Sequence, residues 1–499
     1  MSSSPPSDRK PPEFRLLLVV VAVAALVRLA TLGLYPLIDP TEPRYAEIGR
    51  RMAVLGDWIT PWIGDGVPFW GKPPFSFWLT AGSFKLFGIG EFTARLPHWI
   101  CGVLVVWLLW DFAARRSRRE AAYAAALAAG SALFFASSGA VMTDMALALG
   151  LTMAMRGFWL ALQETGAARL REEAILVLGL AIGLLAKGPL ALVLAGIPVA
   201  AWAVATGNLR RVFATLHWKT ALAAIFALSV PWYLMAEART PGFLDYFIVG
   251  EHWNRFLVSG WEGDLYGHSH AFPRGTIWLF ALLALMPWTV LVPVAAWRWR
   301  HLAQPGRTED RSLSIYLAAW ALAPCVLFTL SGNILWTYVL PGIPAAAFLA
   351  AIWLARLPAA QVERRLLAGG VALTAVVGLA LVLAYDAGDF ERQTSARALV
   401  HDYESRRSAG EPLIFFRKRP LSGAFYSGGQ AGEVMTPEEL QQRLAGGPAW
   451  VAIKERHREG VPEELLDAMQ PVVRGGEYDL YYAGPHLISR ALAAPDRAR

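Results

Sequence analysis

Charge is scarce in this chain of 499 residues. Asp, Glu, Lys and Arg make up 17% of the residues, against about 25% in a typical soluble domain. Hydrophobic residues reach 55%, and 21 residues are tryptophan. These figures exclude disordered and fibrous proteins. They also disfavour a soluble globule, whose surface needs more polar residues. The class that remains is a polytopic membrane protein.

Cysteine is almost absent as well. Cys101 and Cys325 both lie in apolar runs, and no C-x-x-C spacing occurs. We therefore expect two small buried residues, with no disulfide framework and no thiolate metal site. The sequence also lacks a convincing P-loop, Rossmann glycine motif or nucleophile elbow. Soluble nucleotide binding is therefore not supported.

Long apolar runs dominate the sequence between residues 16 and 385. The first, 16–38, is too long for a signal-peptide core and no cleavage site follows it, so it predicts an uncleaved membrane helix. With it, about eleven runs have membrane-spanning length. The other runs lie near 91–111, 121–138, 144–162, 174–187, 189–206, 219–236, 276–297, 313–331, 337–355 and 366–385.

Basic residues gather in alternate short loops, which predicts that these loops are cytoplasmic together with the N-terminal tail, 1–15. This arrangement explains the net charge of +7 without nucleic acid. The opposite set, including 39–90 and 238–275, then faces outward. The basic loop residues are Arg115, Arg116, Arg118, Arg119, Arg169, Arg171, Arg210, Arg211, Lys219, Arg298, Arg300, Arg307, Arg311, Arg356, Arg364 and Arg365.

The C-terminal stretch, 386–499, is charged and its apolar runs are short. It predicts a small soluble α/β domain on the outer face, after a membrane domain over 16–385. The expected strands are 413–416, 449–453 and 478–482, and the expected helices, each with Pro near its start, are 437–444 and 462–469.

The first outer loop carries two amphipathic segments. From Arg44 onward, Tyr45, Ile48, Met52 and Leu55 recur at helical spacing, which predicts a helix on the membrane surface. A second interfacial segment follows over 72–86. A loop on the bilayer suits a lipid-borne substrate, although a solvated amphipathic loop is the alternative.

Acids near a bilayer are costly and are functional candidates. Asp39 ends the first run, and Asp144 lies between two runs on the same predicted side. Either could act as a general base, while Asp144 could instead cap a helix. Lys72, Lys187 and Arg255 lie on that side too and suit a lipid-linked phosphate. Their alternatives are snorkelling for Lys187 and a salt bridge with Glu251 for Arg255.

Several motifs together resemble a family of bacterial membrane glycosyltransferases with the GT-C fold. The first-loop block DPTEPRYAEIGRRM, GDWITP and GKPPFSFWLTAGSFKLFGIGEFTARLP is long and specific, and VMTDMALALG, LLAKGPL, EHWNRF and TYVLPGIP follow in the family's order. The most similar branch is the lipid A aminoarabinose transferases, and the protein O-mannosyltransferases are more distant. The resemblance covers roughly residues 16–355 and implies a polytopic α-helical protein of about 11–13 transmembrane helices.

The resemblance also implies roles for single residues. Asp39 and Asp144 would be the catalytic or acceptor-orienting acids. Glu42, Arg44 and Tyr45 would support them from the first loop. The groups that would hold the donor phosphate or an anionic acceptor are Lys72, Lys187, Arg255 and Tyr338.

Two positions depart from the aminoarabinose branch. Gly71 stands where that branch often has an acid that can help to bind a metal. The sequence therefore gives no firm metal site, and a divalent metal with His252 as a ligand is the alternative. Asn333 stands in a stretch where the branch commonly has a lysine, so the donor or acceptor could differ.

The expected reaction is inverting transfer of a sugar from a polyprenyl (undecaprenyl) phosphate. The first choice is 4-amino-4-deoxy-L-arabinose passed to lipid A at the periplasmic face of the inner membrane. Transfer of a hexose or hexosamine such as mannose to another glycolipid, O-antigen or protein is the alternative. A polytopic transporter is the rival of another class, disfavoured because the ionisable residues cluster at helix ends.

Overall fold

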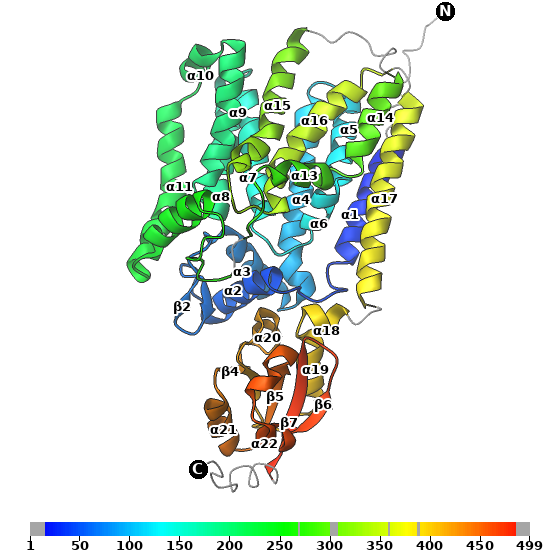
Figure 1. Ribbon diagram of the computed structural model, residues 1–499. Helices are drawn as coiled ribbons and strands as arrows, with labels where there is room; N and C mark the ends of the chain where they lie inside the picture. The colour runs from blue at the N-terminus through cyan, green and yellow to red at the C-terminus, as the bar shows by residue number, and fades with distance from the viewer. Residues whose placement is uncertain (1–14, 268–269, 300–307, 358–359, 387–389, 486–499) are drawn as a thin grey trace, which may run out of the picture. The chain divides into compact units, whose positions relative to one another are not determined.

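The computed structural model describes residues 15–267, 270–299, 308–357, 360–386 and 390–485, and these are mostly helical (Figure 1). Of the expected tail 1–15, all but Arg15 lies outside the described residues, as do Arg300 and Arg307. The chain forms two compact units. The first unit contains Met1–Ala30, Asp57–Leu79 and Arg95–Leu379. The second unit contains Thr31–Gly56, Thr80–Ala94 and Ala380–Arg499.

Every apolar run predicted from the sequence contains helix. The helices are α1 (Arg15–Ala30), α4 (Glu91–Ala114), α5 (Arg118–Ala129), α6 (Ala132–Ser137), α7 (Asp144–Ala161), α8 (Gly166–Lys187), α9 (Leu190–Thr206), α11 (Trp218–Arg239), α13 (Thr276–Ala284), α14 (Trp288–Trp299), α15 (Thr308–Thr329), η4 with α16 (Trp336–Gly342, Ile343–Leu354) and α17 (Ala360–Asp386). The short α10 (Leu209–Thr215) links α9 to α11.

Among the described residues, five helices are long and apolar enough to cross a membrane, or six if the bent pair α13–α14 counts as one. The number is below the expected eleven because the run 121–138 is broken and for two further physical reasons. Helices α1 and α9 have 16 and 17 residues, short of the full hydrocarbon thickness. Helices α7 and α8 carry charged residues, and Arg156 of α7 is 2.5 Å from Glu172 of α8.

Two runs expected to be single helices are broken, so those expectations are wrong. The run 276–297 bends by 79° between α13 and α14, because Pro287 lacks an amide proton and restricts the residue before it. The run 121–138 divides at Gly130, where a Cβ would lie 2.6 Å from the Trp288 ring. That close approach explains why glycine stands at the break.

Helices α7 and α8 pack with their backbones in close contact. A Cβ on Gly150 would lie 2.6 Å from the Gly179 carbonyl oxygen, and a Cβ on Gly179 would lie 2.5 Å from that of Gly150. Small residues of this kind let membrane helices approach closely. The contact fixes the ends of α7 and α8, from which Asp144 and Lys187 come.

The second unit combines the C-terminal region with parts of the first loop. Helix α2 (Thr41–Leu55) buries Ile48 and Met52 and packs against α20 (Leu421–Tyr426). Part of the α2 face that was expected to lie on the membrane is therefore covered by protein, while Leu55 is exposed. Helix α3 (Phe75–Phe87) forms over the second predicted segment. Its residues up to Leu79 belong to the first unit, and those from Thr80 onward belong to the second.

A five-stranded mixed sheet forms the centre of the C-terminal region, in the order β4-β3-β5-β7-β6. The three predicted strands are present as β3 (Leu413–Phe416), β5 (Ala449–Lys454) and β7 (Tyr478–Ala483). The two edge strands, β4 (Gly432–Val434) and β6 (Gln470–Val473), were not predicted. The helices are α18 (Phe390–Thr394), α19 (Arg397–Arg406), α20, α21 (Pro437–Ala445) and α22 (Glu463–Asp467), with the 3₁₀ segment η5 (Glu455–Gly460).

Alternate residues of each strand supply two separate cores. Ile414, Val451 and their neighbours pack with Leu440 of α21 on one face. On the other face, Trp450 and its neighbours pack with Val400 of α19. This period-2 pattern produces the short, fully buried apolar runs that identified the strands in the sequence.

Candidate active site

Glu251 holds two cations together in the first unit. Lys72 follows the β1–β2 hairpin (Trp62–Gly64, Val67–Pro68), and its Nζ lies 2.8 Å from Glu251 Oε2. Arg255, at the start of α12 (Arg255–Leu257), places Nη1 3.0 Å from Glu251 Oε1. Arg255 also lies 3.4 Å from Asp264. The alternative in which Arg255 pairs with Glu251 is therefore confirmed, and Lys72 joins the same carboxylate.

The charges in this cluster reinforce one another. Burial alone would raise the pKa of Glu251, but the positive charges of Lys72 and Arg255 outweigh it and lower that pKa to about 2. Burial would likewise lower the pKa of Arg255, yet the Glu251 charge raises it. Glu251 and Arg255 are therefore both ionised at neutral pH. The Arg255 Nε–H is buried and has no hydrogen-bond partner among the described residues, so one donor is available to a ligand.

Lys187 forms a second centre with Asp144 and Tyr338. Lys187 ends α8, Asp144 begins α7, and the Lys187 Nζ lies 2.6 Å from Asp144 Oδ1. The same ammonium group lies 4.7 Å from the centre of the Tyr338 ring, which η4 supplies. Lys187 is buried, so it does not snorkel. Asp144 occupies the first turn of α7, while Thr143 holds the capping position that the sequence offered to Asp144.

His252 connects the two centres. It follows Glu251 in the π-helical segment η2 (Asp245–Asn254), and its Nε2 lies 3.1 Å from the Lys187 carbonyl oxygen. Its Nδ1 lies 2.7 Å from the Phe247 carbonyl oxygen. Burial lowers the pKa of His252, and the hydrogen bonds to the Phe247 and Lys187 carbonyls partly oppose that effect. The side chain thus ties η2 to the end of α8.

A metal does not fit these residues. Both His252 ring nitrogens face backbone carbonyls, and the described ranges contain no group of three or more His, Cys, Asp or Glu that could hold an ion. At position 71, a Cβ would lie 2.8 Å from the Phe69 ring. An acid there would require Phe69 to move.

Asn333 holds the backbone that carries Arg255. Its Nδ2 donates to the Arg255 carbonyl at 2.6 Å and to the Val258 carbonyl at 2.7 Å. Its Oδ1 accepts the Gly260 N–H at 3.1 Å. The position at which the sequence departs from the aminoarabinose branch therefore has a structural role that sequence reasoning missed. The only signal was a polar residue next to a long apolar run.

Two tyrosines near Glu251 were also missed. The Tyr246 hydroxyl lies 3.4 Å from Glu251 Oε1. The Tyr266 hydroxyl accepts the Trp70 N–H at 3.0 Å and donates to the Pro68 carbonyl at 2.8 Å. Tyr266 therefore fixes the hairpin that precedes Lys72. Tyrosines in an aromatic-rich loop give no distinguishing sequence signal.

Asp39 belongs to the second unit, where its carboxylate bonds to Ser422 of α20. Oδ1 accepts the Ser422 N–H at 3.1 Å, and Oδ2 accepts a short bond from the Ser422 hydroxyl. The Asp39 N–H donates to the Thr394 carbonyl at 3.0 Å. Burial raises the pKa of Asp39 to about 6, and the hydrogen bonds from Ser422 partly oppose that effect.

The other first-loop residues lie beside Asp39 in the sequence and in the same unit. Glu42 is buried and accepts the Ile38 N–H at 3.3 Å, which closes the turn around Asp39. Arg44 has a buried Nε for which the described part of the chain offers no partner. Tyr45 is half-buried on α2.

Comparisons with known proteins show what this chain is similar to. Residues 14–247 match the family of dolichyl-phosphate-mannose-protein mannosyltransferases. Two curated relatives are undecaprenyl phosphate-α-4-amino-4-deoxy-L-arabinose arabinosyl transferases. The one from Edwardsiella ictaluri is 31% identical over 329 residues, 64% of this chain and 56% of that protein. The one from Erwinia tasmaniensis is 32% identical over 338 residues, which are 66% of this chain and 57% of that protein. The chain thus spans little more than half the length of these relatives.

Solved structures extend the likeness over nearly the whole chain. The crystal structure of ArnT from Cupriavidus metallidurans bound to undecaprenyl phosphate has a TM-score of 0.77 at 21% identity, covering 96% of this chain and 99% of that one. The apo structure of the same protein has a TM-score of 0.73 at 22% identity, again covering 96% of this chain and 99% of that one. The fold expected from the first-loop motifs is confirmed. The chain has the GT-C membrane fold of ArnT and is similar in sequence to the aminoarabinose arabinosyl transferases.

Proposed function

We propose that this chain is an inverting glycosyltransferase that moves a sugar from a polyprenyl phosphate to an acceptor at the outer face of a bacterial inner membrane. The observation that carries the proposal is the grouping of Lys72 and Arg255 on Glu251, with an Arg255 Nε–H that has no partner among the described residues. Such fixed donors suit a phosphate leaving group. The names of the relatives support undecaprenyl phosphate as the carrier and 4-amino-4-deoxy-L-arabinose as the sugar. Lipid A is the acceptor that the first-loop resemblance implies.

In this proposal the bond between the sugar C1 and the phosphate oxygen breaks as the acceptor oxygen bonds to C1 from the opposite face. Negative charge grows on the departing phosphate, where Lys72, Arg255 and Lys187 stabilise it. The Tyr338 hydroxyl is a further donor. Asp144 is a positioning residue in this scheme because it holds the Lys187 ammonium group.

Asp39 acts on the acceptor in the proposed reaction. An acceptor phosphate is already a nucleophile, so Asp39 would orient it or stabilise positive charge on the sugar ring. A hydroxyl acceptor would instead lose its proton to Asp39. Arg44 suits an anionic acceptor because its buried Nε has no partner among the described residues. Glu42 supports the loop.

We also propose the orientation expected from the basic loops, with residues 1–15 cytoplasmic, 16–385 in the membrane and 386–499 periplasmic. Acidic partners hold several of the basic residues in place. Arg119 of α5 lies 2.6 Å from Glu363 of α17, and Arg115 lies 3.2 Å from Glu164. The excess of Arg in these loops supports a cytoplasmic location.

Transfer assays with the purified protein test the proposal. With undecaprenyl-phosphate-linked aminoarabinose and lipid A, Lys72→Ala and Arg255→Ala should lower kcat/KM by at least about a hundredfold each. Lys85→Ala and Arg274→Ala, at exposed positions, should match wild type. Equal rates in all four variants would contradict the assignment, and a wild-type protein that consumes no polyprenyl-phosphate sugar would favour the transporter.

A second candidate is transfer of a hexose such as mannose. The match of residues 14–247 to the mannosyltransferase family favours it, as do Gly71 and Asn333, which both depart from the aminoarabinose branch. Offering the same preparation undecaprenyl-phosphate-linked mannose separates the two candidates. Preferential use of mannose would move the acceptor to another glycolipid, O-antigen or protein.

A further inference from the structure

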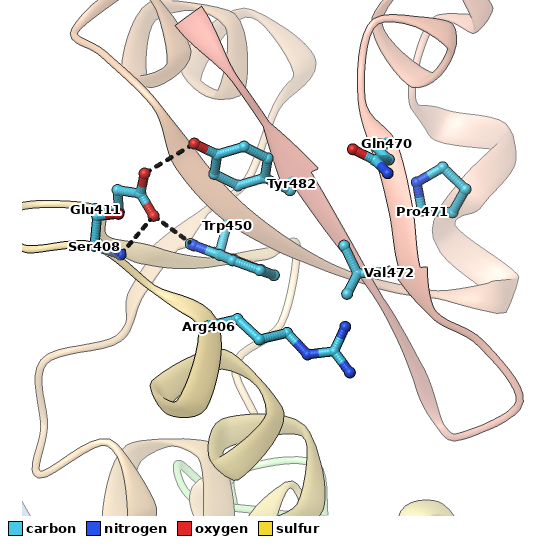
Figure 2. A pocket seen from close by; sticks show the side chains of 8 residues that line it. All are labelled: Arg406, Ser408, Glu411, Trp450, Gln470, Pro471, Val472 and Tyr482. Atoms are coloured by element: carbon cyan, nitrogen blue, oxygen red, sulfur yellow. Dashed lines mark hydrogen bonds between the residues drawn. The ribbon is translucent and has the colours of Figure 1, made fainter.

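A pocket lies at one end of the sheet in the C-terminal region, away from the residues discussed above in sequence and role (Figure 2). Trp450 of β5 pairs across the sheet with Tyr482 of β7, which pairs with Gln470 of β6. The three side chains therefore form a row on one face. Helix α19 covers this face and ends at Arg406. Beyond the end of α19 the row of side chains is not covered, and a cavity of about 450 Å³ lies there.

A buried carboxylate orders the aromatic floor of this pocket. Glu411 accepts hydrogen bonds from Trp450 Nε1 at 2.9 Å, from the Tyr482 hydroxyl at 2.8 Å and from the Ser408 N–H at 3.0 Å. The Trp450 and Tyr482 rings are 4.9 Å apart between centroids. These bonds fix the orientation of both rings, so the floor is preformed.

Two donors on the rim have no protein partner. Neither the Arg406 guanidinium nor the Gln470 amide makes a hydrogen bond or ion pair with any residue that the structure describes. Both belong to the lining of the pocket, and both are exposed. A ligand on the aromatic floor would find an amide and a guanidinium at its edge.

The chemistry of this lining selects a class of ligand. The volume falls within the range of about 300–1,000 Å³ of small-molecule sites. An acyl chain would leave Arg406 and Gln470 without polar partners, and a polyanion would meet the Glu411 charge. A sugar ring offers C–H groups to the aromatic faces and hydroxyls to the amide, the guanidinium and the free lone pairs of Glu411.

We propose that this pocket binds one saccharide unit that carries little or no charge. Its assignment to a sugar of the acceptor glycan rests on the proposed function. The pocket would then contribute to the choice of acceptor, while transfer takes place at the residues of the candidate active site. The saccharide itself is recognised in either its free or its lipid-linked form.

Saturation-transfer NMR on the full-length protein in detergent tests the proposal directly. The probes are N-acetylglucosamine, its β-1,6-linked disaccharide and maltose. Wild type should transfer saturation to the ring C–H protons of at least one probe. Arg406→Leu and Gln470→Leu should raise the Kd for that probe by about tenfold, which corresponds to the loss of one or two hydrogen bonds. Arg443→Leu and Gln441→Leu, on α21 at the opposite sheet face, are the matched controls and should bind as wild type does.

Two results would overturn the proposal: no saturation of any probe by wild type, or equal binding in the pocket variants and the controls. The same titration with intact acceptor glycolipid identifies the source of the saccharide. Loss of glycolipid binding in the pocket variants would support the proposal, and retained binding would oppose it. Because these measurements involve no transfer, they stand even if the proposed function fails. If transfer does occur, the pocket variants should raise the KM for acceptor with kcat unchanged.

Discussion

Glu251 shows how single residues organise the candidate site. It lies 179 positions from Lys72 in the sequence, yet their side chains form a 2.8 Å ion pair. The sequence indicated Lys72, Lys187 and Arg255 as cations by their type and their predicted side of the membrane. It could not supply the pairing of Lys72 with Glu251, because that contact depends on how η2 folds back onto the first loop.

Replacing Glu251 by glutamine tests this organising role. Glu251→Gln keeps the shape but removes the charge that pairs with two half-buried cations, and breaking a fully buried pair costs about 3–5 kcal/mol. We expect a lower Tm and at least a tenfold fall in kcat/KM for the donor, measured by thermal unfolding and initial rates. Glu262→Gln, an exposed acid of the same loop, is the control. A Glu251→Gln protein as stable and active as this control would contradict the role.

Asp39 and Ser422 make a pH-dependent pair. The pKa of Asp39 in the folded protein is about 6, above the ordinary value of 3.8. The protonated carboxyl is therefore favoured by folding, and this contribution to stability falls as the pH rises from about 4 to 6. The proposed reaction needs the carboxylate, so activity should rise over about pH 5–7.

Ser422→Ala removes a hydrogen bond that favours the carboxylate, so it should raise the pKa of Asp39 further. The acid limb of the rate profile should then move to higher pH, and Asp39→Asn should abolish that limb. Ser405→Ala, at an exposed position of α19, should leave the profile unchanged. Identical profiles for wild type and Ser422→Ala would show that Asp39 does not control the acid limb.

At the scale of elements, the contact of α7 with α8 positions Asp144 and Lys187. The apolar runs near 144–162 and 174–187 located both helices, and the second of these runs was separated from the run 189–206 at Gly188 in LLAKGPL. The sequence pattern could not show that Gly150 and Gly179 bring the two backbones together, because isolated glycines have many roles. The breaks at Gly130 and Pro287 were missed for a related reason: the hydropathy of a run continues across a bend.

Adding a methyl group at this contact tests its importance. Gly150→Ala places a Cβ 2.6 Å from the Gly179 carbonyl oxygen, so the helices must separate. We expect a loss of about 2 kcal/mol or more in stability, seen as a lower Tm, and slower transfer as Lys187 moves from Asp144. Gly196→Ala in α9 meets no atom within 4 Å and should be neutral or stabilising by up to about 1 kcal/mol. Equal Tm values for the two variants would rule out a tight contact.

At the scale of the whole molecule, composition and the first-loop motifs were sufficient to predict the fold, and the likeness to the ArnT structure confirms that prediction. The pairing of α2 with α20 was not foreseen. It joins segments that lie more than 360 residues apart in the sequence, and amphipathicity alone does not distinguish a protein partner from a membrane surface.

The proposed orientation can be read from cysteine labelling. Both native cysteines are buried, so wild type should react little with a membrane-impermeant maleimide. In spheroplasts, Gln441→Cys in the C-terminal region should be labelled at once, and Arg210→Cys should be labelled after permeabilisation. The reverse pattern would contradict the orientation.

Mass spectrometry of lipid A tests the central claim most directly. Cells with the gene, without it, and without it but expressing either wild type or Lys72→Ala would be grown identically. The account predicts a pentosamine-sized addition on a lipid A phosphate that disappears with the gene, returns with wild type and does not return with Lys72→Ala. Lipid A of the same mass in all four cultures would contradict lipid A as the acceptor and aminoarabinose as the sugar it receives.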